Sequence, residues 1–366
     1  MKKILMFALV ASVALFTACK DDEETFNAPT VASPDPISAE FSTEAEITFN
    51  YTADAGFKSA SVAATNGTAV IKTNGTAGSK SGSVVVTFTA GNQVGAGSVV
   101  LTVTDNSDQT SKATAVISVL EEQVIFNVDG NITANTTWKT GKVYVLKNRI
   151  AVVSGVTLTI EPGVIIKGEA GTGANATALI IARGGKLMAE GTATQPIIFT
   201  SIADEIMPGQ IASPNLEPTL NGLWGGLLIL GNAPVSASAA TVQIEGIPPS
   251  DQNGLYGGSD ANDNSGVIKF ISIRHGGANI GEGNEINGLT LGGVGAGTVI
   301  ENVEVISNQD DGIEFFGGSV SVKNAIVWNV GDDAIDTDQA WSGTLDNFIV
   351  IRSEEHTSEL QSPNTI

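Results

Sequence analysis

"SNQDDGIEFFGG" at residues 307–318 and "NVGDDAIDTDQA" at residues 329–340 decide the fold. Their carboxylates recur in register 22 residues apart: Asp310 with Asp332, Asp311 with Asp333, and Glu314 with Asp336. In the same region Asn302, Asn324 and Asn347 follow one another at spacings of 22 and 23 residues. The chain therefore repeats one structural unit here.

The same pattern begins earlier, with "LTIEPGVIIKG" at residues 158–168 and "LIIARGGKLMAEG" at residues 179–191. Leu158 and Leu179 are 21 residues apart, and each unit reads as a strand, a tight corner and another strand. A repeat of this length made only of strands predicts a parallel β-helix, because one coil cannot bury its inward side chains without the next. A leucine-rich repeat has a similar period, but it needs recurring Leu and helical segments, which the sequence lacks.

The composition agrees with an all-β chain. Of 366 residues, 42% are apolar, 5% are aromatic and 42 are glycine, a composition that favours short strands and many turns. A chain of this length is long enough for two domains. The net charge of −21 and the pI near 4.3 repel nucleic acid at long range. We therefore expect no nucleic-acid partner.

Residues 28–121 alternate apolar and polar positions between Asn, Gly and Ser turns, as in "GSVVLTVTDNSDQTSKATAVISVL". Period-2 alternation of this kind predicts an antiparallel β-sandwich. The segment resembles the immunoglobulin-like modules of secreted bacterial proteins, which implies the role of a spacer. We expect the β-helix to occupy residues 122–351.

The first residues have the form of a secretion signal. Lys2 and Lys3 precede the apolar run "ILMFALVASVALFTA", and Cys19, the only cysteine of the chain, follows it directly. This arrangement resembles a bacterial lipoprotein signal, which implies a signal peptide at residues 1–18 and an acyl group on Cys19. The acidic tether at residues 19–27, with "KDDEE", is similar to the export signal of Bacteroidetes lipoproteins. That resemblance implies a lipid anchor in the outer membrane and a position facing the cell exterior.

The last residues break the β pattern. "RSEEHTSELQSP" is abruptly polar and closely resembles the translation of a common sequencing-library adapter. We therefore expect residues 352–366 to be an artefact, and the β-helix to be truncated at its C-terminus, continuing in the natural protein beyond Ile351.

Residues 142–351 contain "LIIARGGKLMAEGTATQPIIFTS" and "WGGLLILGNAPV". These segments resemble the first coils of right-handed β-helix lipoproteins of Bacteroidetes. The resemblance implies a right-handed parallel β-helix and says little about activity.

Residues one repeat apart in a β-helix lie roughly one strand spacing apart, about 4.8 Å. Carboxylates at that spacing must be solvated, protonated or bridged by a cation. One interpretation is a Ca²⁺ site with these candidate ligands: Asp310, Asp311, Glu314, Asp332, Asp333, Asp336 and Asp338. Another is structural, since Asp and Asn at corners hydrogen-bond backbone N–H groups.

A catalytic interpretation comes from a resemblance. "DGIE" and the following "GDDAI" are similar to two motifs of the polygalacturonase family of glycoside hydrolases. The resemblance implies that Asp332 is a general acid and that Asp311 and Asp333 activate water for an inverting displacement.

Three further features are candidates for binding. "DANDNSG" places Asp260, Asn262 and Asn264 at alternate positions, as in calcium loops, although an Asx-rich turn gives the same pattern. Arg274 and His275 could reach a ligand. Among the tryptophans considered as platforms for sugar stacking, we expect Trp341 to be exposed in a loop and Trp224 to lie in the core.

Taken together, these features predict a cell-surface lipoprotein whose β-helix binds an extracellular polysaccharide or another cell-surface polymer, or serves an adhesive or structural role. The alternative is a carbohydrate-active enzyme, either a polygalacturonase-like inverting glycoside hydrolase or a polysaccharide lyase. Ca²⁺ is the cofactor that the sequence suggests.

Overall fold

The computed structural model describes residues 25–281 and 284–352, and the chain divides into two compact units, Met1–Glu122 and Gln123–Ile366. The expected signal peptide, Cys19 and most of the acidic tether lie outside the described residues, as do residues 353–366 of the expected adapter-derived segment. Within the part of the chain that is described, no helix is long and apolar enough to cross a membrane.

The first unit is a sandwich of two four-stranded sheets. Its strands are β1 (Thr30–Val31), β2 (Ile37–Glu40), β3 (Glu44–Thr52), β4 (Phe57–Thr65), β5 (Gly67–Thr73), β6 (Ser81–Ala90), β7 (Gly95–Asp105) and β8 (Thr110–Leu120). One sheet has the order β1-β3-β6-β5 and the other β2-β8-β7-β4. These orders correspond to the ABED and CFG sheets of an immunoglobulin-like domain, with β2 added in parallel beside β8. This part of the fold prediction is confirmed.

Alternation along the strands fills the sandwich core. In β8, Ala113, Ala115, Ile117 and Val119 are buried while the residues between them are exposed. Hydrophobic burial of one face of each sheet against the other gives this unit a core of its own.

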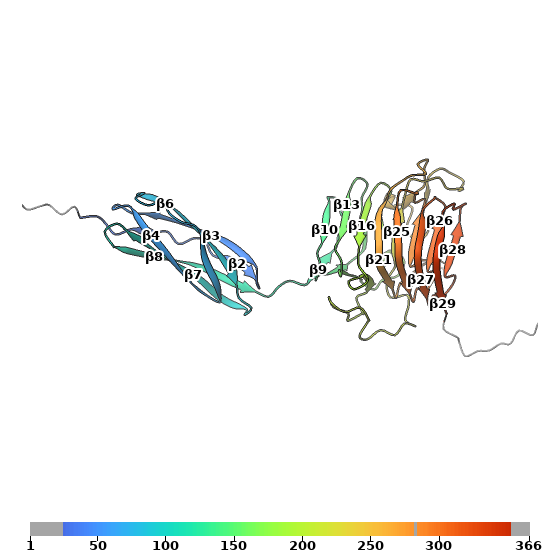
Figure 1. The fold of residues 1–366 in the computed structure, drawn as a ribbon. Helices are drawn as coiled ribbons and strands as arrows, with labels where there is room; N and C mark the ends of the chain where they lie inside the picture. The colour runs from blue at the N-terminus through green and yellow to red at the C-terminus, as the bar shows by residue number, and fades with distance from the viewer. Residues whose placement is uncertain (1–24, 282–283, 353–366) are drawn as a thin grey trace, which may run out of the picture. The chain divides into compact units, whose positions relative to one another are not determined.

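The second unit is a parallel β-helix, as the sequence predicts. Its early strands are β9 (Ile125–Val128), β10 (Thr136–Trp138), β11 (Val143–Leu146), β12 (Arg149–Val152), β13 (Thr157–Ile160), β14 (Ile165–Gly168), β15 (Ala178–Ile181), β16 (Lys186–Glu190), β17 (Ile197–Ser201) and β18 (Leu227–Leu230). The later strands are β21 (Gly266–Arg274), β24 (Leu289–Gly292), β25 (Val299–Ile306), β26 (Ile313–Phe316), β27 (Ser321–Trp328), β28 (Ile335–Asp338) and β29 (Leu345–Ile351). Strands of successive coils lie side by side in Figure 1, for example β10, β13 and β16.

The coils stack into two main sheets. The six-stranded sheet has the order β12-β15-β18-β24-β26-β28, and every one of these pairings is parallel. The eleven-stranded sheet contains the other parallel strands, and β21 pairs with both β16 and β17. From β21 onward each coil therefore has one long bent strand where earlier coils have two.

Inward side chains form the predicted ladders. One ladder of the six-stranded sheet runs in register through Ile150, Leu179, Leu227, Leu289, Ile313 and Ile335. All but Ile335 are fully buried, and Ile335 packs against them. Each coil thus buries its apolar residues on the coil before it, which is the reason a strand-only repeat folds as a solenoid.

An asparagine ladder makes the bend in the long strands. Asn302, Asn324 and Asn347 have φ angles of 59°, 59° and 60°, in the left-handed region that Asn tolerates better than most residues. The Asn324 side-chain amide donates to Asn302 Oδ1 at 2.9 Å, and that of Asn347 donates to Asn324 Oδ1 at 2.7 Å. The repeat of Asn in the sequence therefore marks a repeated backbone bend.

Two long excursions interrupt the repeat. The first excursion, residues 202–223, lies between β17 and β18. The second excursion, residues 231–265, lies between β18 and β21 and contains β19 (Val242–Gln243), β20 (Leu255–Tyr256) and the short 3₁₀ helix η2 (Gln252–Gly254). Their apolar residues pack on the outer face of the six-stranded sheet or beside the long strands, and they position the side chains described next.

Candidate functional site

Along one ladder, the outer face of the six-stranded sheet changes from apolar to acidic side chains. Residues Ile180, Leu228, Thr290, Glu314 and Asp336 follow in register on successive strands. The early positions are apolar and are covered by the second excursion, whereas the last two are carboxylates. The 22-residue register predicted that Glu314 lies beside Asp336, and the pairing of β26 with β28 confirms it.

Two groups of carboxylates meet at this end of the sheet. One contains Asp310, Asp311 and Asp332, the other Asp311, Glu314 and Asp336, and in each group the nearest carboxylate oxygens all lie within 4.8 Å of one another. Asp311 belongs to both groups. We name these five residues, together with Glu245, the acidic site.

Asp333 and Asp338 belong to neither carboxylate group. The backbone N–H of Asp333 donates to Asp311 Oδ1 at 2.9 Å, so Asp333 holds the Asp311 carboxylate from the next coil. Asp338 is exposed at the end of β28, beside Phe316 of the preceding coil. Of the predicted acidic ladder, the structure thus brings five carboxylates together and leaves these two apart.

Glu245 and Asn287 complete the acidic site, and the repeat pattern gave no sign of them. Glu245 lies in the second excursion, and its charge acts on the carboxyl group of Glu314. The Asn287 side-chain amide is almost fully buried; it donates to Glu314, and its nitrogen lies 3.4 Å from Glu245 Oε1. The Asn287 Oδ1 is buried without a hydrogen-bond partner among the described residues.

Burial and mutual repulsion raise the pKa values of these carboxyl groups. Burial, then the charges of Glu245, Asp311 and Asp336, raises the pKa of Glu314 to about 9. Burial raises the pKa of Asp311 to about 7, aided by Asp310, Asp336 and Asp332 and opposed by the Asp333 N–H. Burial also raises the pKa of Glu245. At neutral pH the acidic site therefore retains protons unless another positive charge replaces them.

Tyr256 and Phe316 cover the apolar side of the acidic site. Their rings meet edge to face with centroids 6.1 Å apart, and both are buried. Burial raises the pKa of Tyr256 to about 12, while the Gln339 side chain hydrogen-bonds its hydroxyl. This apolar cover is one source of the low polarity that raises the carboxyl pKa values.

Trp341 is not the exposed platform that the sequence suggested. Its ring stacks on Phe315 at a centroid distance of 4.2 Å, and its indole N–H donates to the Val320 carbonyl oxygen at 2.9 Å. The loop after β28 folds back over the end of the core, so Trp341 is half-buried. Trp224, expected in the core, is fully buried.

The residues of the second calcium candidate stabilise turns. Asp260 Oδ1 accepts the Asn262 N–H at 3.0 Å, and Asn264 Oδ1 accepts the Gly266 N–H at 2.9 Å. These are Asx-turn contacts, the alternative that the sequence left open. The buried carboxylate of this loop is that of Asp263, which accepts from Ser265 Oγ at 3.1 Å and whose pKa burial raises.

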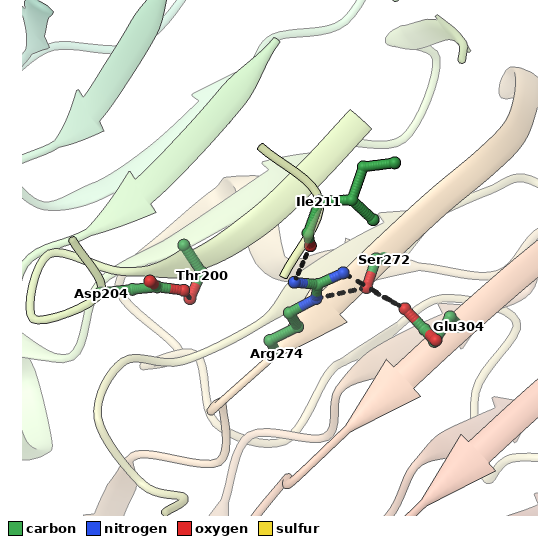
Figure 2. A network of polar contacts seen from close by, with 6 residues as sticks. All are labelled: Thr200, Asp204, Ile211, Ser272, Arg274 and Glu304. Carbon is green, nitrogen blue, oxygen red and sulfur yellow. Dashed lines mark hydrogen bonds and ion pairs between the residues drawn. The ribbon is translucent and has the colours of Figure 1, made fainter. Parts of the chain in front are cut away.

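Arg274 and His275 lie at the end of β21, beside the first excursion. Figure 2 shows the Arg274 guanidinium between the Ile211 carbonyl oxygen and Ser272, with Glu304 on the far side. Nη1 lies 2.7 Å from the Ile211 oxygen, Nε 2.7 Å from Ser272 Oγ, and Nη2 3.5 Å from Glu304 Oε2. Arg274 thus ties the excursion to the long strands.

The comparison with protein families identifies the second unit. The model of the pectate-lyase-like β-helix domain family matches residues 130–365. The chain belongs to this family. No curated protein matches the chain.

Among solved structures, the chain is similar to a Family 28 exopolygalacturonase of Yersinia enterocolitica, with 12% sequence identity and a TM-score of 0.21. The match covers 90% of this chain and 75% of the exopolygalacturonase. At such an identity and TM-score, the similarity does not bear on activity.

Proposed function

We propose that this protein is a cell-surface lipoprotein whose β-helix binds an extracellular polysaccharide through a divalent cation, Ca²⁺, held at the acidic site. One observation carries the proposal: Asp311, Glu314 and Asp336 place carboxylate oxygens within 4.8 Å of one another. Carboxylates so close repel one another in the ionised state, and a divalent cation removes that repulsion.

The donor set fits Ca²⁺. Calcium takes six to eight oxygen ligands at about 2.3–2.6 Å in flexible geometry, and carboxylates and amide oxygens are its usual protein ligands. The acidic site offers carboxylates from consecutive coils, and rotation of the Asn287 amide would direct its unpartnered oxygen toward Glu314. Asp332 is exposed and Asp336 half-buried, which leaves one side open to oxygen atoms of a polymer.

The charge of the chain supports a cation-mediated contact. With a net charge of −21, the protein repels acidic polymers, and neutral ones gain little from a bare acidic surface. A bound cation offers open coordination positions to hydroxyl or carboxylate oxygens. Binding should therefore depend on the cation.

The experiment measures retention of a panel of neutral and acidic polysaccharides on the immobilised protein, in Ca²⁺ and in EDTA. Retention in Ca²⁺, loss in EDTA and unchanged polymer length after long incubation are the expected results. Retention that is equal in EDTA would contradict the role of the cation.

Hydrolysis is the second candidate, and the pKa of Asp311 near 7 favours it, since a catalytic acid or base works best near the ambient pH. The spacing is less favourable. Carboxyl groups of inverting glycosidases are roughly 6.5–9.5 Å apart, whereas the oxygens of Asp311 and Asp332 lie within 4.8 Å. New reducing ends that disappear in Asp332→Asn would establish a hydrolase, and unsaturated sugars would indicate a lyase.

The anchor is part of the same proposal and rests on the sequence. Lipidation of Cys19 and export through the acidic tether would place the β-helix outside the outer membrane. Labelling of growing cells with radioactive palmitate should mark the wild type and leave Cys19→Ala unlabelled. Protease added to intact cells should remove the β-helix; full protection would place the protein inside the cell envelope.

A further inference from the structure

A hollow of about 320 Å³ lies between the first excursion and the ends of the long strands. Ile211, Leu216 and Pro218 line it from the excursion, and Ile306 and Trp328 from β25 and β27. Arg274 and His275 form its polar part. A small hollow with apolar walls and a few polar groups is the usual form of a site for a small organic ligand.

The hollow is held open by fixed contacts. Arg274, Ile306 and Trp328 follow in register on β21, β25 and β27. On the opposite wall the Pro218 carbonyl oxygen accepts from Ser307 Oγ, and Arg274 bonds the Ile211 carbonyl. The walls therefore keep their separation without a ligand, which lowers the cost of binding.

The polar groups of the hollow carry little net charge. The Arg274 guanidinium is paired with Glu304 at 3.5 Å (Figure 2). His275 Nδ1 lies 2.6 Å from the Leu220 carbonyl oxygen, which can only accept, so Nδ1 carries the proton and Nε2 of the neutral ring is an acceptor. Burial lowers the pKa of His275, which also favours the neutral ring. The hollow thus offers donors on Arg274 and an acceptor on His275.

We propose that this hollow binds one neutral pyranose ring of a glycan, with its apolar face against Trp328 and its hydroxyl groups hydrogen-bonded to Arg274 and His275. A fully apolar ligand would make no use of the remaining donors of Arg274 or of His275 Nε2. An anionic ligand would gain little, because Glu304 already balances the charge of the Arg274 guanidinium. A sugar ring has one apolar face and hydroxyl groups at its edge, so it satisfies both walls.

The inference rests on the proposed function for the choice of a glycan, and the fold links the two sites. Ser307 at one end of the corner 307–311 contacts the first excursion, while Asp310 and Asp311 at the other end belong to the acidic site. The corner 307–311 thus joins the two sites, and a glycan long enough to pass around it would contact both.

The test uses methyl glycosides of glucose, galactose and mannose, titrated in EDTA and followed by tryptophan fluorescence and saturation-transfer NMR. At least one glycoside should bind with a Kd of about 1–10 mM, which is ordinary for one sugar ring. Trp328→Ala should weaken binding at least tenfold, and Leu216→Trp, which fills the hollow from the excursion, should abolish it. Ile326→Ala is the matched control, because Ile326 lies on the same strand but lines a neighbouring hollow.

Absence of binding by all three neutral glycosides would overturn the inference, as would equal binding by Trp328→Ala or tighter binding of methyl glucuronide. Because EDTA is present throughout, failure here leaves the cation-mediated binding of polymers untouched. In turn, Glu314→Gln should retain glycoside binding even where polymer binding is lost.

Discussion

Glu314 lies among several other acidic groups. The charge of Glu245 acts on it, Asn287 donates to it, and Asp311 and Asp336 lie in the same carboxylate group. Its pKa of about 9 means that it keeps its proton at neutral pH when no cation is bound. In the cation-bound state the proton must leave, so proton release and cation binding are linked.

Glu314 should make the stability of the cation-free protein depend on pH. The pKa of Glu314 is about 9 in the folded protein, whereas the ordinary value is 4.5. At pH values between these two, the folded state therefore binds more protons than the unfolded state. The contribution of Glu314 to the free energy of unfolding should therefore be fully present below pH 4.5 and be lost as pH rises toward 9. Urea unfolding in EDTA over this pH range measures the effect. The unfolding free energy of Glu314→Gln should fall less steeply with pH than that of the wild type.

Glu304→Gln is the control, since Glu304 lies outside the acidic site and pairs with Arg274. Its pH slope should match that of the wild type. Equal slopes for the wild type and Glu314→Gln would show that Glu314 has no raised pKa.

Residues within the repeat could be placed from the sequence. The spacing of Glu314 and Asp336 gave their pairing, since register in a solenoid follows from the repeat length. Glu245 could not be found in this way, because the second excursion has no partner coil from which to read its register. Asn287 precedes β24, and the spacing from this coil to the next is 24 residues, not the 22 residues of the acidic segments. The prediction that Trp341 is exposed was wrong for a related reason. The repeat spacing predicts where strand residues point, but it does not predict that the loop after β28 folds back on Phe315.

The asparagine ladder is the feature that shapes the long strands at the element scale. Each Asn has a positive φ, and two amide hydrogen bonds join the three residues from one coil to the next. The first long strand, β21, makes the same bend at Phe270 with a φ of 50°, so the asparagines add hydrogen bonds between coils to a bend that the backbone already repeats.

Asn324 occupies the centre of the ladder and should be the most sensitive position. Asn324→Ala places a residue without amide bonds in the left-handed region and should cost about 2–3 kcal/mol of unfolding free energy. Asn324→Gly keeps the conformation and loses only the bonds, so it should cost about 1–2 kcal/mol. Denaturant unfolding measures both, and an equal loss in the two variants would contradict the role of backbone strain.

The elements themselves were largely predictable. Period-2 alternation gave the sandwich strands, and the recurring apolar strands with Gly-rich corners gave the coils. The two excursions were not predicted as such, because their Pro- and Gly-rich sequence has neither period. Those segments carry Glu245 and most of one wall of the hollow.

At the scale of the whole molecule, the two units have separate hydrophobic cores. We expect two unfolding transitions, of which Ca²⁺ shifts only that of the β-helix. At a calcium concentration a hundred times the Kd, mass action adds about 2.7 kcal/mol to its unfolding free energy. Calorimetry of the full chain checks this, with residues 25–122 expressed alone to mark the sandwich transition. A shift of both transitions would mean that calcium binds elsewhere as well.

The order of the two folds, sandwich then β-helix, followed from the sequence because each has its own periodicity. The ligand could not be predicted from the sequence, since the chemistry of a solenoid face depends on side chains that differ between coils. The chemistry of the β-helix therefore lies in the acidic site and not in the fold.

The most direct test is a calorimetric titration of Ca²⁺ into the wild type, Asp311→Asn and Asp338→Asn at pH 6 and pH 8. One saturable site should appear, tighter at pH 8 because the protons of Asp311 and Glu314 must leave before the cation binds. Asp311→Asn should weaken it at least tenfold, while Asp338→Asn, outside both carboxylate groups, should change it little. No binding heat at either pH, or equal affinity in Asp311→Asn, would contradict a calcium site at Asp311.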